Sequence, residues 1–329
     1  MTVTRGTEPL LSVRDLSICF DTRHGPLRAV DGITFDLAPG EILGMVGESG
    51  AGKSLTGTAI TGLLERPGRI DRGEIHFEGQ RIDTLSKDDM RCLRGRKIGA
   101  IFQDPLTSLN PLMTVGKQLI QTIRTHLPLS RDAARTRAID LLAEVGIPAP
   151  EARVDQYPHE FSGGMRQRVV IALALCANPA LVIADEPTTA LDVSIQSQIL
   201  ELLRKMCRDH GAAVILVTHD MGVIAETADR VAVMYSGRVV EIGPVERVVK
   251  DPRHPYTAGL MQSIPRIGSN AHRLTQIEGA MPRLTALPDG CAFNPRCPNA
   301  MDICRRQKPK SQPVGDGQVA CHLFQEELA

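Results

Sequence analysis

One stretch of the chain carries the residue types and spacing that bind a nucleoside triphosphate. It reads Gly47-Glu48-Ser49-Gly50-Ala51-Gly52-Lys53-Ser54 and fits the phosphate-loop pattern G-x-x-x-x-G-K-[ST]. Glycines let backbone N–H groups turn toward phosphate oxygens, which a Cβ atom would obstruct. Lys53 would reach the β- and γ-phosphates, and Ser54 would ligate Mg²⁺. Because a chance match has a probability on the order of one in a hundred, we predict nucleotide binding.

The residues on either side are suited to hold this loop. Residues 41–46, which are apolar or small after Glu41, predict a short buried strand. Residues 53–64 can form a helix, with no proline before Pro67. The positive end of that helix would point at the phosphates. We therefore expect a strand, a phosphate loop and a helix in succession.

A second apolar run ends in two carboxylates. Asp185 and Glu186 follow the apolar or small residues 180–184, as expected where a buried parallel strand meets a ligand. Asp185 would hold Mg²⁺, directly or through water, and Glu186 would polarise the attacking water. The alternative is two solvated carboxylates at the start of a loop, which the preceding residues disfavour.

Two other positions could contact a nucleotide. Phe20 stands 33 residues before Lys53 and could stack on a base, although spacing alone fits a core phenylalanine equally well. Ser162, Gly163 and Gly164 open a helix that runs to about residue 177. A helix N-terminus of this composition can bind an anion, but taken alone it is most often a simple loop.

Three polar residues follow predicted elements and indicate little when taken singly. Gln103 stands between a strand and Pro105, where a loop residue is usual. Asp192 fits a helix N-cap. His219 follows an apolar strand, where histidines are usually structural.

The remaining pattern predicts alternating strands and helices. We expect strands at residues 11–20, 33–37, 74–79, 97–102, 181–186 and 213–217, and a hairpin at 231–240 with a Ser-Gly turn. Residues 111–178 have a helical pattern, with Ser130 as a helix N-cap and Gly146 as a helix stop. This pattern indicates a helical insertion between strands of a nucleotide-binding fold.

Composition excludes several classes of protein. Lys+Arg and Asp+Glu both number 38, and the chain has no Trp and three Tyr, so nothing points to a nucleic-acid partner. The longest apolar run, residues 169–177, is too short to span a membrane, and residues 1–10 contain no signal peptide. We expect the eight cysteines to be mostly reduced or metal-bound, with Cys19, Cys92, Cys176 and Cys207 buried in the core.

Together these motifs resemble the ATP-binding subunit of an ABC transporter, over about residues 10–250. The motifs that match in order are the phosphate loop, Gln103 at the Q-loop, the signature Ser162-Gly163-Gly164, the pair Asp185 and Glu186, Asp192 at the D-loop and the switch histidine His219. Phe20 falls where that family stacks an aromatic ring on adenine. Six matches in order are far more specific than any one of them.

The resemblance is closest to the oligopeptide/dipeptide permease branch. It rests on the signature residues 161–168, on the stretch His254-Pro255-Tyr256-Thr257-Ala258-Gly259-Leu260, and on a cysteine-containing tail. Nickel and glutathione importers share much of this, so the resemblance indicates the class of transporter more specifically than the solute.

The resemblance implies an α/β fold: a P-loop NTPase core of ABC type with an antiparallel β subdomain and an inserted helical subdomain. The implied domains are a cassette at residues 1–250, with the helical part at about 104–178, and a small C-terminal extension at 251–329 with four cysteines. The implied activity is ATP hydrolysis coupled to peptide uptake. The implied partners are a second ABC ATPase, by family habit a paralogue, two transmembrane permease subunits and a solute-binding protein, with no nucleic acid. The chain would lie peripherally on the cytoplasmic face of the cell membrane.

The resemblance also implies roles for the site residues. Two cassettes would close head to tail, so that each ATP lies between one phosphate loop and the partner's Ser-Gly-Gly corner. Glu186, His219 and Gln103 would act in catalysis, and Ser54, Gln103 and Asp185 would hold Mg²⁺. The nucleotide contacts would be Phe20, Gly47, Ser49, Gly50, Gly52, Lys53, Ser54, Ser162, Gly163, Gly164 and Asp192.

The last four cysteines, Cys291, Cys297, Cys304 and Cys321, differ from the scattered ones. They follow the spacing C-x5-C-x6-C-x16-C in a segment poor in apolar residues, which would need a staple to fold. This spacing fits zinc modules poorly and iron–sulfur clusters better. Some similar peptide-permease ATPases carry a [4Fe–4S] site here, so we predict one, with free thiols as the alternative.

Two functions of other classes compete with this interpretation. A non-transport ABC ATPase typically has duplicated cassettes or long coiled-coil insertions, and this chain has neither. A phosphate-loop kinase or GTPase would explain residues 47–54 but leave Ser162–Gly164 and His219 without a role.

Overall fold

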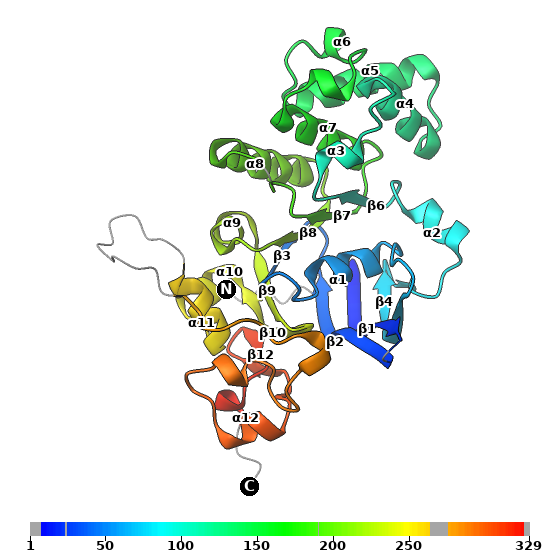
Figure 1. Cartoon of the computed structure of the whole chain (residues 1–329). Coiled ribbons are helices and arrows are strands. Elements are labelled where there is room, and N and C mark those ends of the chain that lie inside the picture. The colour runs from blue at the N-terminus through cyan, green and yellow to red at the C-terminus, as the bar shows by residue number, and fades with distance from the viewer. Residues whose placement is uncertain (1–7, 24, 190, 264–275, 326–329) are drawn as a thin grey trace. The chain divides into compact units, whose positions relative to one another are not determined.

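The computed structural model describes residues 8–23, 25–189, 191–263 and 276–325 (Figure 1). Contacts between residues divide the chain into two compact units. Unit 1 comprises Met1–Leu37, Ile42–Asp83 and Val217–Ala329, and unit 2 comprises Ala38–Glu41 and Thr84–Leu216. The predicted domain division at residue 250 is not among these boundaries and stays a prediction.

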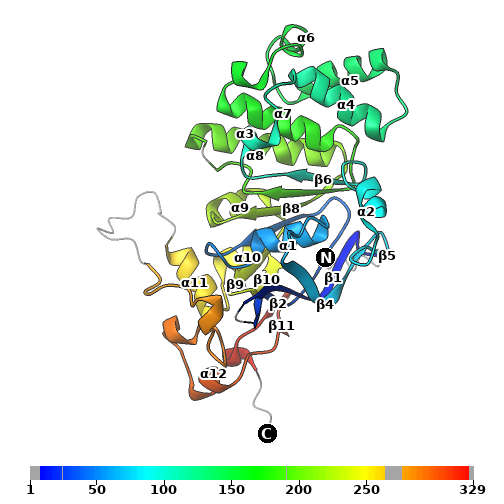
Figure 2. The ribbon, with the colours of Figure 1, turned by 45° about the vertical axis from the view of Figure 1, so that its right-hand side comes forward.

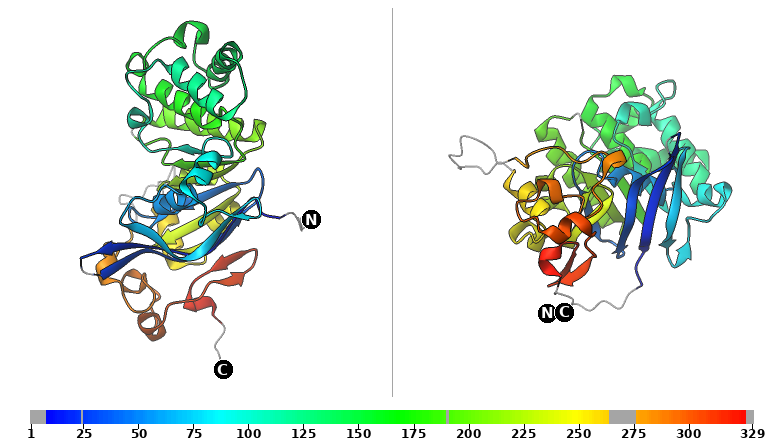
Figure 3. Two further views of the ribbon diagram at one scale, coloured as in Figure 1. Left: turned by 90° about the vertical axis from the view of Figure 1, so that its right-hand side faces the viewer. Right: turned by 60° about the horizontal axis from the view of Figure 1, so that its bottom comes forward.

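An antiparallel sheet begins unit 1. Its order is β2-β1-β4-β5, with β1 at Leu11–Thr22, β2 at Gly25–Leu37, β4 at Gly68–Phe77 and β5 at Gln80–Arg81. The long strands lie side by side in the right-hand view of Figure 3. The strand predicted at 11–20 is confirmed. The hairpin arm predicted at 74–79 is the end of β4, which begins six residues earlier, at Gly68, and stops at Phe77. Strand β2 begins eight residues before the predicted residue 33, because it pairs with β1 from Gly25 to Leu37.

A second sheet in unit 1 carries the element that leads into the phosphate loop. Its order within the unit is β11-β12-β10-β9-β3, with β3 at Ile42–Val46, β9 at Arg230–Tyr235, β10 at Arg238–Pro244, β11 at Gln312–Val314 and β12 at Gly317–Val319 (Figure 2). Strand β3 is buried throughout and runs parallel to β9, as a central strand requires. The predicted β9–β10 hairpin with its Ser236–Gly237 turn is confirmed.

Short helices complete unit 1. They are α1 at Lys53–Ile60, α9 at Met221–Thr227, α10 at Val245–Lys250, α11 at Pro255–Gln262, α12 at Asp302–Arg306, and the 3₁₀ turns η2 at Leu284–Ala286, η3 at Asn294–Arg296 and η4 at His322–Phe324. Helix α1 ends at Ile60, four residues before the predicted Leu64. Gly62 has a positive φ, and the N–H groups of Gly62 and Leu63 donate to the carbonyls of Ala59 and Thr58, which is a Schellman stop.

Unit 2 combines parallel strands with a run of helices. Its strands stand in the order β8-β7-β6, with β6 at Ile98–Ile101, β7 at Leu181–Asp185 and β8 at Ala213–Thr218, whose last two residues belong to unit 1. Its helices are α2 at Lys87–Leu93, α3 at Pro105–Ser108, α4 at Val115–His126, α5 at Arg131–Glu144, α6 at Pro150–Arg153, η1 at Pro158–Glu160, α7 at Gly163–Leu175 and α8 at Val193–Asp209.

Helices α3 to α7 occupy the chain between β6 and β7, which confirms the predicted helical insertion. Ser130 caps α5 by accepting the Ala133 N–H, as predicted. Gly146 ends α5 as predicted, since its N–H donates to the Ala143 carbonyl and that of Ile147 to the Leu142 carbonyl. The helical region therefore follows from its own capping residues.

The prediction for the four scattered cysteines is wrong at one position. Cys19, Cys176 and Cys207 are buried, but Cys92 is exposed. Cys92 lies on α2, a seven-residue helix that buries Met90 alone. A helix this short covers little surface, so an apolar residue on it need not be in the core. Among the described residues, no helix combines the length and apolar character needed to cross a bilayer.

Candidate functional site

The phosphate loop joins β3 to α1 in unit 1, as predicted. Gly47 has φ 152° and lies so close to β9 that a Cβ atom would collide with the Met234 carbonyl oxygen. Gly52, with φ 100°, is the N-cap residue of α1. These two backbone conformations favour glycine, and they turn the loop tightly enough for its N–H groups to face a ligand.

Lys53 lies within this loop and is 6% exposed. Its Nζ donates to the carbonyl oxygens of Gly47, at 2.8 Å, and Glu48, at 3.1 Å. The ammonium group is thus held inside the loop's curve, the place where phosphate oxygens would sit. Ser54, the second residue of α1, is exposed at the same helix N-terminus. A buried cation, a helix N-terminus and glycine backbone fit a polyphosphate.

Phe20 and His219, both in unit 1, lie at strand ends. Phe20 is half-buried in β1 and pairs with Gly68 of β4, where a Cβ atom would approach the Phe20 ring within 2.9 Å. His219 is exposed directly after β8 and precedes Asp220, which caps α9. Their roles toward a nucleotide stay predictions.

In unit 2 the structure brings Gln103 and Glu186 together. Gln103 Nε2 donates to Glu186 Oε2 at 3.0 Å, and Thr189 Oγ1 donates to the same oxygen at 2.9 Å. Glu186 follows Asp185, the last residue of β7, and has φ 45°, which is uncommon for a residue with a Cβ atom. Two donors and this backbone conformation fix the direction of the Glu186 carboxylate.

The Ser-Gly-Gly corner lies at the start of α7. Ser162 is the N-cap residue, and its Oγ accepts the Met165 N–H at 3.4 Å. Ser162 and Gly163 are exposed, whereas a Cβ atom at Gly164 would lie 2.8 Å from Ile195 of α8. Packing therefore accounts for Gly164, and exposure leaves Ser162 and Gly163 accessible. Asp192 stands at the N-cap position of α8, as expected, but makes no side-chain capping bond.

Two residues from the C-terminal part of the chain contact the phosphate loop, and the sequence patterns do not predict these contacts. Arg296 Nη1 lies 2.9 and 3.0 Å from the two Glu48 carboxylate oxygens, and Tyr256 Oη accepts the Glu48 N–H at 2.9 Å. Burial alone would lower the pKa of Arg296, but its bonds to Tyr235 and Glu48 outweigh burial and raise it. Tyr256 belongs to the stretch 254–260 on which the family resemblance rests, but no local pattern predicts either contact, because Tyr256 is 208 and Arg296 is 248 positions from Glu48.

The C-terminal cysteines do not form the predicted metal site. The pKa of Cys321 is raised to about 11, first by burial and in smaller part by nearby Cys291, Cys297 and Cys304, so the four thiols share one region. Yet the described part of the chain contains no group of three or more His, Cys, Asp or Glu side chains arranged to hold a metal ion. The iron–sulfur prediction is therefore not supported.

The iron–sulfur prediction assumed that the cysteine-containing segment needs a metal or covalent cross-link in order to fold. The structure shows that it does not need one. Strand β12 pairs with β10, so the segment extends the sheet of unit 1. Phe293 is buried against Tyr235, Tyr256 and His254, with ring centroids 5.2, 5.4 and 5.8 Å away. This tail folds on the core of unit 1 and does not depend on a core of its own.

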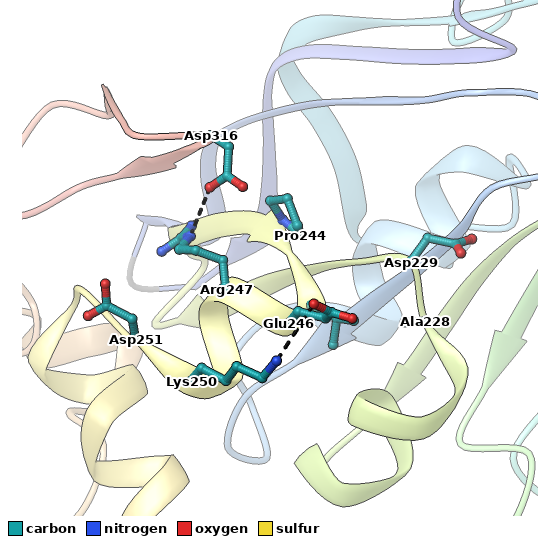
Figure 4. A pocket seen from close by; sticks show the side chains of 9 residues that line it. Ala228, Asp229, Pro244, Glu246, Arg247, Lys250, Asp251 and Asp316 are labelled. Carbon is teal, nitrogen blue, oxygen red and sulfur yellow. Dashed lines mark ion pairs between the residues drawn. The ribbon is translucent and has the colours of Figure 1, made fainter. Parts of the chain in front are cut away.

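A shallow cavity of about 660 Å³ in unit 1 contains none of the predicted site residues (Figure 4). Four of its charged side chains form pairs, Arg247 with Asp316 at 3.4 Å and Lys250 with Glu246 at 3.7 Å. Of the other two, Asp251 pairs with Arg253 and Asp229 accepts the Ile42 N–H. Since these charges are already compensated, the cavity has no evident ligand preference.

Comparisons with known proteins agree with the arrangement of these elements. Residues 30–189 match the family model for "ABC transporter", and residues 240–304 match "Oligopeptide/dipeptide transporter, C-terminal region". The oligopeptide transport ATP-binding protein OppD of Bacillus subtilis is 54% identical, over 93% of this chain and 86% of its own length. The dipeptide transport ATP-binding protein DppD of the same organism is 50% identical, over 98% and 96%. A solved dimeric structure of the ATP-binding cassette MJ0796, in a post-hydrolysis state with ADP and Pi, has 27% identity and TM-score 0.64, covering 71% of this chain and 98% of that one.

Proposed function

We propose that the chain hydrolyses ATP to drive peptide import, because it belongs to the oligopeptide/dipeptide branch of the ABC transporter ATP-binding proteins. The observation that carries the ATPase activity is the phosphate loop with Lys53 held inside it. Peptide as the solute is supported by the names of the relatives and by the match of residues 240–304 to a peptide-transporter region.

The proposed binding step uses the phosphate loop. Lys53 would exchange its bonds to the Gly47 and Glu48 carbonyls for bonds to phosphate oxygens, while the amides of the loop and of α1 donate to the same group. Ser54, Gln103 and Asp185 are the proposed ligands of Mg²⁺, which when bound would offset the charge of the phosphates. The oxygen donors of these side chains suit that ion.

The proposed hydrolytic step uses Glu186. The carboxylate would accept a proton from water as the water oxygen bonds to the γ-phosphorus and the bond to the β-phosphate oxygen breaks. The hydrogen bonds from Gln103 and Thr189 support this role, because they hold one Glu186 oxygen and direct the carboxylate. His219 is proposed to contact the γ-phosphate, and Phe20 the adenine.

The proposed assembly pairs two cassettes head to tail. The exposed Ser162 and Gly163 support a role toward a nucleotide held by another chain. Asp192 is proposed to act with them, since a Cβ atom at Gly163 would lie 3.7 Å from Leu191, the residue before Asp192. MJ0796 has been solved as a dimer with ADP and Pi, which favours a dimer of cassettes here. We propose a paralogous ATPase as the second cassette, together with two permease subunits and a solute-binding protein, at the cytoplasmic face of the cell membrane.

Nickel or glutathione import by the same machine is the alternative solute assignment. A non-transport ABC ATPase is disfavoured by the peptide-transporter match at residues 240–304. We include no metal cluster at the four C-terminal cysteines. Iron and visible absorbance in protein purified without oxygen would restore that cluster to the proposal.

Reconstitution tests the proposed function. The chain is co-expressed with candidate permease subunits and a candidate second ATPase from its source organism. The complex is placed in liposomes and supplied with the solute-binding protein and labelled di- or oligopeptides. We expect peptide uptake that requires ATP and is lost in Lys53→Ala. Uptake of nickel or glutathione in place of peptides would correct the solute, and absence of ATPase activity in the intact complex would refute the proposal.

A further inference from the structure

The C-terminal region reaches back to the phosphate loop through one arginine. Arg296 is the last residue of η3 and has a side chain that is 7% exposed. Besides Glu48, its guanidinium donates to the carbonyls of Ile277, at 3.2 Å, and Glu278, at 2.9 Å, and to Tyr235 Oη at 3.3 Å. One buried cation therefore joins the loop, strand β9 and two carbonyls of the C-terminal region.

Aromatic side chains hold this arginine in place. Tyr235 and Tyr256 are fully buried with ring centroids 4.6 Å apart, and Phe293 packs against both. The Arg296 guanidinium lies 5.9 Å from the centre of the Tyr235 ring. Because the Glu48 N–H also bonds to Tyr256, both ends of residue 48 are tied to the same cluster.

Glu48 presents an electrostatic difficulty for the loop that contains it. It is the second residue of a loop proposed to bind a triphosphate, and its carboxylate carries the same sign of charge as the ligand. Its side chain remains 30% exposed, so solvent screens that charge incompletely. A compensating cation in contact with the carboxylate would remove most of this repulsion.

We propose that Arg296 is a positioning residue of the nucleotide site, which neutralises Glu48 and holds it so that the phosphate loop accepts ATP. The inference rests on the proposed nucleotide site at residues 47–54. It gives the C-terminal region a direct effect on nucleotide affinity, exerted through Glu48 rather than through contact with ATP. Met281, whose methyl carbon would lie 3.2 Å from a Cβ atom at Gly50, is a second neighbour of the loop from that region.

The test is a double-mutant cycle on the full chain, with the non-hydrolysable analogue AMP-PNP and Mg²⁺ as the probe. Calorimetry would give the dissociation constant of the wild type, Arg296→Gln, Glu48→Gln and the double variant at low and high salt. We expect Arg296→Gln to weaken binding roughly 5- to 10-fold at low salt, and less at high salt, because the uncovered charge is screened. The double variant should bind within about two-fold of the wild type, because it carries neither charge.

Lys308→Gln is the matched control. Lys308 is also a cation of the C-terminal region paired with an acid elsewhere in unit 1, since its Nζ lies 3.0 Å from Asp31 Oδ2. That pair lies outside the phosphate loop, so binding should change less than about two-fold. If Arg296→Gln does not fold, Arg296→Lys replaces it. This variant keeps the charge, so we expect a loss below about three-fold, and a larger, salt-independent loss would refute charge compensation.

The outcomes separate this inference from the proposed function. A wild-type chain that does not bind the analogue would refute both. Wild-type binding with unchanged affinity in Arg296→Gln would refute the inference alone. If the double variant or Glu48→Gln binds AMP-PNP as weakly as Arg296→Gln does, the contact has a purely structural role. That result would also refute the inference.

Discussion

Glu241 offers a strong test of how the C-terminal region is attached to unit 1. This carboxylate on β10 is completely buried, and it accepts hydrogen bonds from Arg247 and from the backbone N–H groups of Arg253 and His254. The acceptor thus fixes the chain between α10 and α11. Replacing Glu241 by alanine would leave one guanidinium and two amides without that acceptor.

The expected loss can be worked from these partners. Each buried amide without an acceptor costs about 1–3 kcal/mol, and breaking a buried ion pair from one side costs about 3–5 kcal/mol. These terms overlap, and Arg247 keeps its contact with Asp316, so we expect Glu241→Ala to lose about 3–5 kcal/mol. Glu241→Gln keeps an acceptor oxygen and should lose less, about 1–2 kcal/mol.

Urea unfolding followed by tyrosine fluorescence suits this question. The chain has no Trp, and two of its three Tyr, Tyr235 and Tyr256, lie in the aromatic cluster next to His254. Glu246→Ala is the control, because Glu246 lies on the same segment with an 83% exposed side chain and pairs weakly with Lys250. A Glu241→Ala midpoint equal to that of the control would refute the attachment role of Glu241.

Three further predictions concern turnover, pH and thiol reactivity. Glu186→Gln should retain AMP-PNP binding but slow ATP turnover roughly 10²- to 10³-fold, and an unchanged rate in the assembled transporter would refute its assignment. Burial lowers the pKa of His254 to about 3, below the unfolded value near 6.5, so the unfolded state binds the proton more readily. The free energy of unfolding should therefore fall as the pH drops below 6.5, by about 2 kcal/mol at pH 5. His254→Asn retains a capping acceptor but does not titrate, so its urea midpoint should depend less on pH over that range, and a pH dependence equal to that of the wild type would contradict this. Iodoacetamide at pH 8 should label Cys92 before Cys19, Cys176 and Cys207, because Cys92 alone of these four is exposed. Burial also raises the pKa of Cys176 to about 11 and that of Cys207 to about 12, which keeps these thiols protonated. Peptide mass mapping would measure the labelling, and equal labelling of all four would contradict this.

Local patterns predicted most of the elements that hold the site. The strand into the phosphate loop, the strand ending at Asp185 and the caps at Ser130 and Gly146 all depend on residues within a few positions. The early end of α1 also depends on local residues, because Gly62 with its positive φ stops the helix before the predicted Leu64. These features could be predicted because the interactions that produce them are local.

Features that depend on distant residues could not be predicted in this way. The contact of Arg296 with Glu48 joins positions that are 248 residues apart, and no sequence motif predicts that contact. The metal or covalent cross-link expected for the cysteine-containing tail would be needed only if that segment folded in isolation. Phe293 and strand β12 instead pack the segment on unit 1. The exposure of Cys92 likewise depends on what α2 packs against, which residue type does not reveal.

The β11–β12 hairpin, red in the left view of Figure 3, has a consequence for how the chain can be cut. Residues Gln318 and Val319 pair with Ile242 and Glu241, so the hairpin occupies the hydrogen-bonding edge of β10. A protein truncated near residue 250 would expose that edge, with the apolar Val240 and Ile242 along it, to other molecules. Open strand edges recruit strands from neighbouring chains, and such a fragment is expected to precipitate or form insoluble aggregates during expression.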